Sequence, residues 1–189
     1  MKVIDKEEFM LRKTYFLDFL NSGVLFLHPT DTIYGLGCNA EDSEAVKNLR
    51  ELKKRSNQPF TIIAPSKDWI RNHCEVSEEA EKWLSLLPGP YTLILKMKKN
   101  DVIATEVTNG LDTVGVRIPD HWMKDVVEEL GYPIVSTSAN IMGGDFMTSL
   151  DNLHHDISSG LGLSIYEGEK KGRPSKIVDL TSDGEIIER

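Results

Sequence analysis

Short apolar runs alternate with stretches of helical periodicity, and this alternation constrains the fold more than any other feature. The runs "VLFL", "FTIIA" and "YTLIL" contain no charged residue and are too short for core helices. Such runs are typical of strands that are buried on both faces. Between the first two runs, apolar residues recur at helical spacing at Ala45, Leu49 and Leu52. The pattern predicts an α/β fold, with one twisted open sheet of mixed parallel and antiparallel strands covered by helices.

The expected elements follow one another without an internal repeat, a low-complexity tract or a linker-like change in composition. Asp42 or Ser43 can cap one helix, Ser77 can cap another, and glycines suit two helix ends at Gly23 and Gly131. Helices are expected at residues 5–21, 43–54, 66–73, 77–87, 120–131 and near 149–158. Strands are expected at residues 24–27, 60–64, 91–97, 113–118, 133–137, 163–166, 176–180 and 185–188.

Several classes of protein are disfavoured by bulk properties. The 189 residues suffice for one domain with a real core. No apolar run approaches the roughly 18 residues of a membrane helix, and the N-terminus lacks the apolar core of a signal peptide. Two cysteines suggest neither a disulfide framework nor a four-ligand zinc site. These features predict a cytoplasmic location.

Charge is unevenly distributed along the chain. The net charge of −8 argues against a protein that binds nucleic acid over its whole surface. Two local basic clusters nevertheless suit a small polyanion such as a nucleotide, with solvated helix faces as the alternative interpretation. The clusters comprise Lys47, Arg50, Lys53, Lys54 and Arg55, and then Lys170, Lys171, Arg173 and Lys176.

Familiar catalytic and nucleotide-binding motifs are missing. There is no P-loop, and "GLGCNA" departs from a dinucleotide fingerprint because Ala40 stands at its third glycine position. If ATP binds, the side chains of Lys53 and Arg55 must therefore hold its phosphates. No G-x-S-x-G elbow occurs, and the pair His154–His155 lacks further ligands at metal spacing. Polar loops follow several strands, which predicts a ligand site where the carboxyl ends of those strands meet.

Seven motifs taken together resemble one family. They are "HPTDTIYGLGC", "KKRSNQPFTIIAPS", "PGPYTLILK", "VGVRIPDH", "VSTSANIMGG", "PSKIVDL" and "EIIER". In this order and spacing, over about residues 20–189, they are similar to the threonylcarbamoyl-AMP synthases, the YrdC-like family. The resemblance implies synthesis of threonylcarbamoyl-AMP and pyrophosphate from L-threonine, bicarbonate or CO2, and ATP. The product would pass to a tRNA threonylcarbamoyl-transferase complex for the t6A modification. The chain looks like the short form, a single catalytic domain over 1–189 with no additional C-terminal domain.

The resemblance also implies roles for individual residues. Lys53 and Arg55 are expected to act in catalysis by holding ATP phosphates. Threonine would be bound by Thr32, Arg117, Ser138 and Ser175. ATP would be contacted further by Thr113, Asn140, Thr148 and Arg189. Mg²⁺ is implied by the ATP chemistry, although the sequence contains no dedicated metal cage. Because the carbamate of threonine is already anionic, the reaction needs alignment and charge neutralisation rather than a strong base.

Some positions depart from the family pattern or lack a role. Ser56 replaces a usual proline, Lys176 stands where threonine is common, and Arg189 is the last residue. Asp31 and Tyr34 receive no role, and Gly35 and Gly37 are interpreted as clearing space for a ligand. Two alternatives stay open: a YrdC-like paralogue that binds nucleotide without this activity, and a module that binds double-stranded RNA or tRNA.

Overall fold

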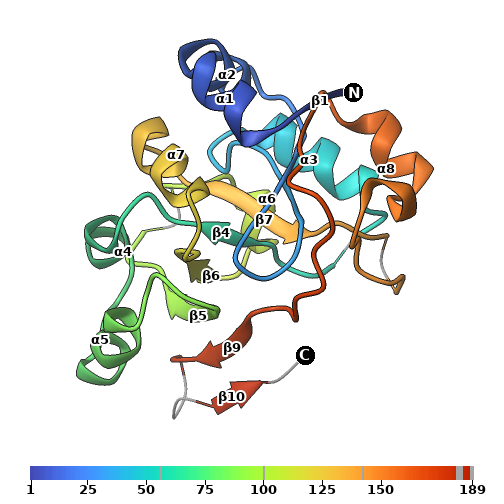
Figure 1. Cartoon of the computed structure of the whole chain (residues 1–189). Helices are drawn as coiled ribbons and strands as arrows, with labels where there is room; N and C mark the ends of the chain where they lie inside the picture. The colour runs from blue at the N-terminus through green and yellow to red at the C-terminus, as the bar shows by residue number, and fades with distance from the viewer. Residues whose placement is uncertain (56, 100, 142, 182–184, 188–189) are drawn as a thin grey trace.

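The fold is built on one mixed sheet. The computed structural model describes residues 1–55, 57–99, 101–141, 143–181 and 185–187. Within these residues the sheet has ten strands in the order β1-β8-β2-β3-β7-β4-β6-β5-β9-β10. The sheet contains both parallel and antiparallel neighbours, and helices pack on its faces (Figure 1). The predicted α/β fold class is confirmed.

Elements lie close to the predicted ranges. The strands are β1 (Lys2–Ile4), β2 (Phe26–His28), β3 (Gly35–Gly37), β4 (Thr61–Ile63), β5 (Tyr91–Lys96), β6 (Thr113–Arg117), β7 (Ile134–Ser138), β8 (Leu163–Ile165), β9 (Lys176–Asp179) and β10 (Glu185–Ile187). The helices are α1 (Lys6–Leu11), α2 (Lys13–Asn21), α3 (Ser43–Leu52), α4 (Lys67–His73), α5 (Glu78–Ser85), α6 (Thr105–Thr108), α7 (Met123–Leu130), α8 (His155–Gly160) and the 3-10 helix η1 (Leu150–Asn152).

Local sequence explains the helix ends. The Asp42 side chain accepts hydrogen bonds from the backbone N–H groups of Glu44 and Ala45, so Asp42 rather than Ser43 caps α3. Ser77 caps α5 as predicted. Gly131 ends α7 with a φ of 75°, a left-handed conformation that glycine adopts without a steric penalty.

Two predicted helices are divided. The helix expected over 5–21 breaks at Arg12, whose φ of −120° and ψ of 35° lie outside the helical region. The one expected near 149–158 is η1 followed by α8. Strands β1 and β3 and helix α6 were not predicted, and the strand expected at 24–27 begins two residues later, at Phe26.

Gly35 and Gly37 of the motif "HPTDTIYGLGC" form a strand, not a ligand-clearing turn. A Cβ at Gly35 would lie 2.8 Å from His28 Nε2, and a Cβ at Gly37 would lie 2.8 Å from the Val135 carbonyl oxygen. β3 lies between β2 and β7, so both contacts are with the protein itself. Glycine is therefore required here because neighbouring strands and side chains approach closely.

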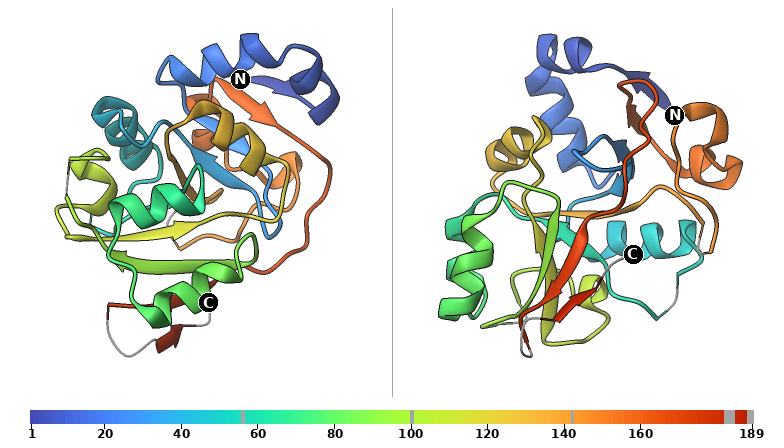
Figure 2. Two further views of the ribbon diagram at one scale, coloured as in Figure 1. Left: turned by 90° about the vertical axis from the view of Figure 1, so that its left-hand side faces the viewer. Right: turned by 60° about the horizontal axis from the view of Figure 1, so that its bottom comes forward.

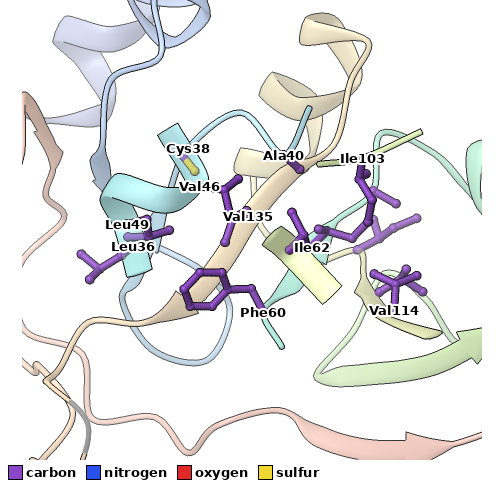
Figure 3. Close-up of a cluster of buried hydrophobic side chains, with 14 of the residues drawn as sticks. Leu36, Cys38, Ala40, Val46, Leu49, Phe60, Ile62, Ile103, Val114 and Val135 are labelled. Atoms are coloured by element: carbon purple, nitrogen blue, oxygen red, sulfur yellow. The ribbon is translucent and has the colours of Figure 1, made fainter. Parts of the chain in front are cut away.

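The core lies in two clusters on opposite faces of the sheet. The larger cluster includes Val46 and Leu49 of α3, Ile62 and Val135 of the sheet, and Phe60 (Figure 3). The smaller cluster packs α1, α2 and α7 against the other face through residues such as Phe16 and Val127. Figure 2 shows these three helices gathered at one end of the molecule, away from β5, β9 and β10. Part of the second face is thus left for a binding site.

Candidate functional site

One row of side chains crosses the uncovered part of the sheet. β7, β4, β6, β5 and β9 contribute one residue each, directly paired from strand to strand: Ser136, Thr61, Gly115, Ile94 and Asp179. Paired residues in a sheet point to the same face. The adjacent row lies in the larger core cluster: Val135, Ile62, Val116, Leu93 and Val178. One face is therefore apolar core, and the other face forms the floor of a site.

The location differs from the predicted one. Arg117 ends β6 opposite Ile63, which also pairs with Ile134 at the start of β7. The carboxyl ends of β6 and β7 consequently lie at opposite ends of the sheet. The prediction that the site gathers where carboxyl ends meet is wrong, because β7 runs antiparallel to β4. The site instead extends along a sheet face.

Two adjoining cavities occupy this face. The smaller has a volume of about 60 Å³. It is lined largely by hydroxyl groups, by Arg117 and by the loop between β2 and β3, residues 29–34, here termed the opening loop. The larger has a volume of about 680 Å³, within the usual range of small-molecule sites. Its floor includes Ile94, Leu111 and Ile177. Six residues line both cavities: Arg55, Pro59, Thr61, Thr92, Ser138 and Phe146.

Arg117 organises the smaller cavity. The residue is 6% exposed, its Nη2 donates to Asp31 Oδ1 at 2.5 Å, and its Nη1 donates to Thr32 Oγ1 at 3.2 Å. The other Asp31 oxygen accepts from the backbone N–H of Asp120 at 3.0 Å. Burial lowers the pKa of Arg117, and the Asp31 carboxylate opposes that shift. Asp31 therefore holds the guanidinium in place, which gives it the role that the sequence did not supply.

Hydroxyl groups in the smaller cavity bond to one another and to backbone. Thr30 Oγ1 lies 3.0 Å from Thr32 Oγ1, and Thr92 Oγ1 lies 2.8 Å from Ser175 Oγ. Thr61 Oγ1 donates to the Ser136 carbonyl oxygen at 2.5 Å. These bonds fix the positions of side chains that can donate to or accept from a polar ligand.

Lys53 belongs to the larger cavity. It is 2% exposed, and its Nζ donates to the Ser138 and Asn140 carbonyl oxygens at 2.5 and 2.8 Å and to Asn140 Oδ1 at 3.3 Å. Three oxygens match the three donors of a charged ammonium group. Burial, and then the charge of Arg55, lower the pKa of Lys53 to about 7. Its charge is therefore sensitive to pH near neutrality.

The loop after β7 is ordered by the same contacts. Ser138 Oγ donates to Asn140 Oδ1 at 2.6 Å, and Asn140 Nδ2 donates to the Gly144 carbonyl oxygen at 2.6 Å. Arg55 Nη1 donates to Thr137 Oγ1 at 3.2 Å, and its Nη2 donates to the Pro59 carbonyl oxygen at 2.7 Å. Lys53 and Arg55 thus join the end of α3 to the end of β7 at the boundary between the cavities.

A segment between β8 and β9, residues 166–175 and here termed the strap, runs beside the opening loop (Figure 1). Tyr34 OH donates to the Gly168 carbonyl oxygen at 2.7 Å and accepts from the Glu167 N–H at 2.9 Å. A Cβ at Gly172 would lie only 1.9 Å from the Thr32 carbonyl oxygen. Tyr34 therefore fastens the strap, whose end supplies Ser175 to the smaller cavity.

The strap is anchored a second time at the start of α7. The Glu167 carboxylate accepts from Trp122 Nε1, and its Oε2 lies 3.0 Å from His121 Nε2 and 3.3 Å from Lys170 Nζ. Burial lowers the pKa of His121, and Glu167 opposes that shift. These contacts fix the strap relative to α7 on the side away from Ser175.

His28 lies beneath the opening loop. It is fully buried, and burial lowers its pKa to about 3. The ring is consequently neutral at physiological pH. Since Gly35 separates it from the smaller cavity, His28 supports the wall and does not line it.

Most residues implied by the resemblance come together. Thr32, Arg117, Ser138 and Ser175 line the smaller cavity. Lys53, Arg55, Thr113, Ser138 and Asn140 line the larger one. Thr148 lines neither, and its Oγ1 accepts from Asn152 Nδ2 at 3.0 Å. Arg189 and Ser56 lie outside the described residues, and Lys176 begins β9.

Sequence reasoning missed Thr61, Thr92 and Phe146, which line both cavities. A signal was available for the two threonines, because each is the second residue of an apolar run, in "FTIIA" and "YTLIL". A polar residue in a buried strand requires a partner or a ligand. No comparable signal marked Phe146.

Neither a metal-ligand cluster nor a membrane-spanning helix occurs among the described residues. Throughout the described ranges, no three or more His, Cys, Asp and Glu side chains form a group that could hold a metal ion. None of the helices seen there is long and apolar enough to cross a membrane.

The fold and the adjoining cavities define an open-sheet α/β domain with a two-chambered binding site on one sheet face. A family model for the Sua5, YciO and YrdC proteins, described as "Telomere recombination", matches residues 18–189. The chain belongs to this family.

Relatives of known name cover most of the chain. It is 39% identical over 168 residues to a threonylcarbamoyl-AMP synthase of Pyrococcus abyssi, covering 86% of this chain and 49% of the relative. It is 33% identical over 177 residues to a putative threonylcarbamoyl-AMP synthase of Methanocaldococcus jannaschii, covering 88% of this chain and 81% of that protein.

A solved structure gives the same fold. P. abyssi Sua5 complexed with L-threonine superimposes with a TM-score of 0.85 at 35% identity, covering 97% of this chain and 55% of that one. The chain therefore spans about half the length of the P. abyssi proteins that it matches.

Proposed function

We propose that this chain forms threonylcarbamoyl-AMP and pyrophosphate from L-threonine, bicarbonate or CO2, and ATP. The observation that carries the proposal is the shared wall of the two cavities, where Arg55 and Ser138 line both. A reaction that joins an amino acid to a nucleotide needs two sites that meet at the reacting atoms. The names of the P. abyssi and M. jannaschii relatives support this choice.

The smaller cavity suits a zwitterionic amino acid. The Arg117 guanidinium can donate to the threonine carboxylate, because its Nε is buried and has no hydrogen-bond partner in the part of the chain that the structure describes. Thr32, Ser138 and Ser175 offer hydroxyl groups to the rest of the molecule. The complex of P. abyssi Sua5 with L-threonine supports a threonine site in this family.

The larger cavity suits ATP. Its apolar floor can accept the base, while Lys53 and Arg55 lie toward the smaller cavity, where the phosphates would be. Mg²⁺ would enter with ATP as part of the substrate, coordinated mainly by phosphate oxygens and water. Asp179 is the carboxylate among the described lining residues that could add a protein ligand.

The proposed chemistry requires positioning and charge neutralisation. The amine of threonine adds to CO2 and loses a proton, which gives a carbamate anion. A carbamate oxygen then attacks the α-phosphorus, and the bond to the β,γ-pyrophosphate breaks. Lys53 and Arg55 would neutralise the charge that develops on the phosphates. The product would serve a tRNA threonylcarbamoyl-transferase complex, and we assign the reaction to the cytoplasm.

The test uses the purified chain with L-threonine, bicarbonate and MgATP. We expect pyrophosphate and threonylcarbamoyl-AMP to form, and both to be lost when threonine is omitted. Arg117→Ala should abolish threonine-dependent pyrophosphate release while ATP binding persists. A preparation that binds ATP but releases no threonine-dependent pyrophosphate would contradict the proposal and favour a nucleotide-binding paralogue. Salt-sensitive affinity for double-stranded RNA or tRNA without catalysis would favour a binding module instead.

A further inference from the structure

Phe146 stands out at the boundary of the two cavities. It lines both of them, together with Arg55, Pro59, Thr61, Thr92 and Ser138. Most of the others present a charged or hydroxyl group, whereas Phe146 presents a large apolar ring. Phe146 is 39% exposed, which places it among the large hydrophobic residues that the fold leaves open to solvent. An apolar ring among polar groups at such a boundary calls for an explanation.

The backbone around Phe146 is held on both sides. The following residue, Met147, is 1% exposed, and its N–H donates to the Ala139 carbonyl oxygen at 3.3 Å. On the other side, Asn140 Nδ2 donates to the Gly144 carbonyl oxygen at 2.6 Å. Asn140 in turn contacts Lys53. Phe146 is therefore positioned by residues that also hold the phosphate-binding lysine of the proposed function.

In the proposed reaction, hydrolysis by water is most harmful at the boundary of the two cavities. The carbamate would enter from the smaller cavity and the α-phosphorus from the larger, so the new bond forms between them. Polar groups alone would leave that place hydrated. Excluding water protects reactive intermediates from hydrolysis.

We propose that Phe146 excludes water from the junction of the two cavities and so protects the threonylcarbamoyl-adenylate bond from hydrolysis. This inference rests on the proposed function. The competing step is attack of a water oxygen on the carbamoyl carbon of the bound product. The bond from that carbon to the phosphate oxygen then breaks, AMP leaves with the electron pair, and the released carbamate takes up a proton and loses CO2. Threonylcarbamoyl-AMP and water thus become threonine, CO2 and AMP.

The test measures coupling, defined as threonylcarbamoyl-AMP formed per pyrophosphate released in early time points. Phe146→Gln keeps a similar length but is polar, and Phe146→Ala removes the ring. Phe146→Leu keeps an apolar group in the same place. A parallel sample of isolated product in buffer corrects for decay in solution. Circular dichroism confirms that each variant is folded.

We expect coupling near one in the wild-type protein and in Phe146→Leu. Phe146→Ala and Phe146→Gln should form at least threefold less product per pyrophosphate, with the difference recovered as AMP. Leu111→Ala is the matched control, because Leu111 is exposed and lines the larger cavity but not the smaller. It should weaken ATP binding and leave coupling unchanged.

The outcomes separate the two proposals. Wild-type protein that releases no threonine-dependent pyrophosphate overturns the proposed function and, with it, this inference. Active wild-type protein with Phe146→Ala and Phe146→Gln as tightly coupled as Phe146→Leu overturns the inference alone. In that case a raised KM for ATP would show that Phe146 only contacts the nucleotide.

Discussion

The two cavities hold their buried cations in different ways. In the smaller cavity Arg117 pairs with a carboxylate, and the Arg117 and Asp31 side chains are 7% and 12% exposed. In the larger cavity Lys53 Nζ contacts only carbonyl and amide oxygens within the described residues. The first arrangement is neutral as a pair, whereas in the second no carboxylate compensates the charge of the protonated lysine.

This difference matches the ligands that we propose. An amino acid is a zwitterion, so it needs a donor of fixed geometry more than net positive charge. A triphosphate is a polyanion, so it needs uncompensated positive charge close by. The contrast teaches that burial alone does not decide how a cation is used. Its partners decide, and they can be changed one at a time.

The largest effect is expected from breaking the pair in the smaller cavity. Asp31→Ala leaves the buried Arg117 charge without compensation, which should lower the free energy of unfolding by about 3–5 kcal/mol. Chemical denaturation of the purified variant measures this. The double variant Asp31→Ala with Arg117→Met should recover much of the loss, since removing both partners of a buried pair is often close to neutral.

An exposed ion pair provides the control. Asp125 pairs with Lys124 at 2.8 Å, but its side chain is 58% exposed. Asp125→Ala should change the free energy of unfolding by less than about 0.5 kcal/mol. Equal losses for Asp31→Ala and Asp125→Ala would refute the view that the carboxylate of Asp31 compensates a buried charge.

The next effect concerns the strap. Its residues Pro174 and Ser175 line the smaller cavity, and none of its residues lines the larger one. Gly172→Ala would place a Cβ 1.9 Å from the Thr32 carbonyl oxygen and push the strap and opening loop apart. Threonine-dependent pyrophosphate release should fall about a hundredfold, the cost of an ångström of misplacement. ATP affinity should change little. Lys171→Ala, an exposed neighbour on the strap, is the control; matching losses in ATP affinity and activity for Gly172→Ala would contradict the separation of the cavities.

The sequence could predict features that depend on neighbouring residues, but not those that depend on distant partners. Strand order aside, the apolar runs and helical periodicity determined the elements within a few residues, because both signals are local. The family resemblance assigned Thr32 and Arg117 to the same threonine site, and both line the smaller cavity. Asp31 and Tyr34 had no role in the sequence, because their partners lie 86 and 134 residues away.

The sequence also did not predict which residues of neighbouring strands lie opposite one another. Thr61 and Thr92 face the site only because of the register of β4, β6, β5 and β9, which no short stretch encodes. The short β3 strand was missed for the same reason, since its glycines are explained by His28 and Val135 on neighbouring strands. The position of Thr148 outside both cavities likewise depends on its bond to Asn152.

A smaller effect tests the uncompensated cation of the larger cavity. Burial lowers the pKa of Lys53 to about 7, so the free protein loses this charge as pH rises above 7. Bound phosphates would favour the charged form and raise the pKa. The Kd for ATP should therefore rise about tenfold per pH unit between the free and bound pKa values. Calorimetric titration between pH 7.5 and 9, where ATP itself no longer titrates, measures this dependence.

Two variants of neighbouring lysines sharpen that measurement. Lys53→Met should bind ATP more weakly and without the pH dependence. Lys54→Met is the control, because Lys54 is exposed and pairs with Asp156 at 3.1 Å. It should keep the wild-type slope. If Lys53→Met retains the slope, another group near the phosphates is the one that titrates.

The final prediction concerns His28, which lies beneath the wall of the smaller cavity. Burial lowers the pKa of His28 from 6.5 to about 3. Below pH 6.5 the His28 side chain is therefore protonated in the unfolded chain but stays neutral in the folded protein. Stability from this group is complete above pH 6.5 and falls by up to about 1.4 kcal/mol per pH unit as pH drops toward 3. His28→Gln should show a shallower loss between pH 6 and 4 in urea unfolding, whatever its stability at pH 7. His155→Gln, at an exposed position, controls for the loss of a histidine. If the free energy of unfolding falls with pH equally steeply in the wild type and in His28→Gln, His28 must accept a proton inside the fold. Lys53 would then not be the sole buried cation of this comparison that is held without a carboxylate among the described residues.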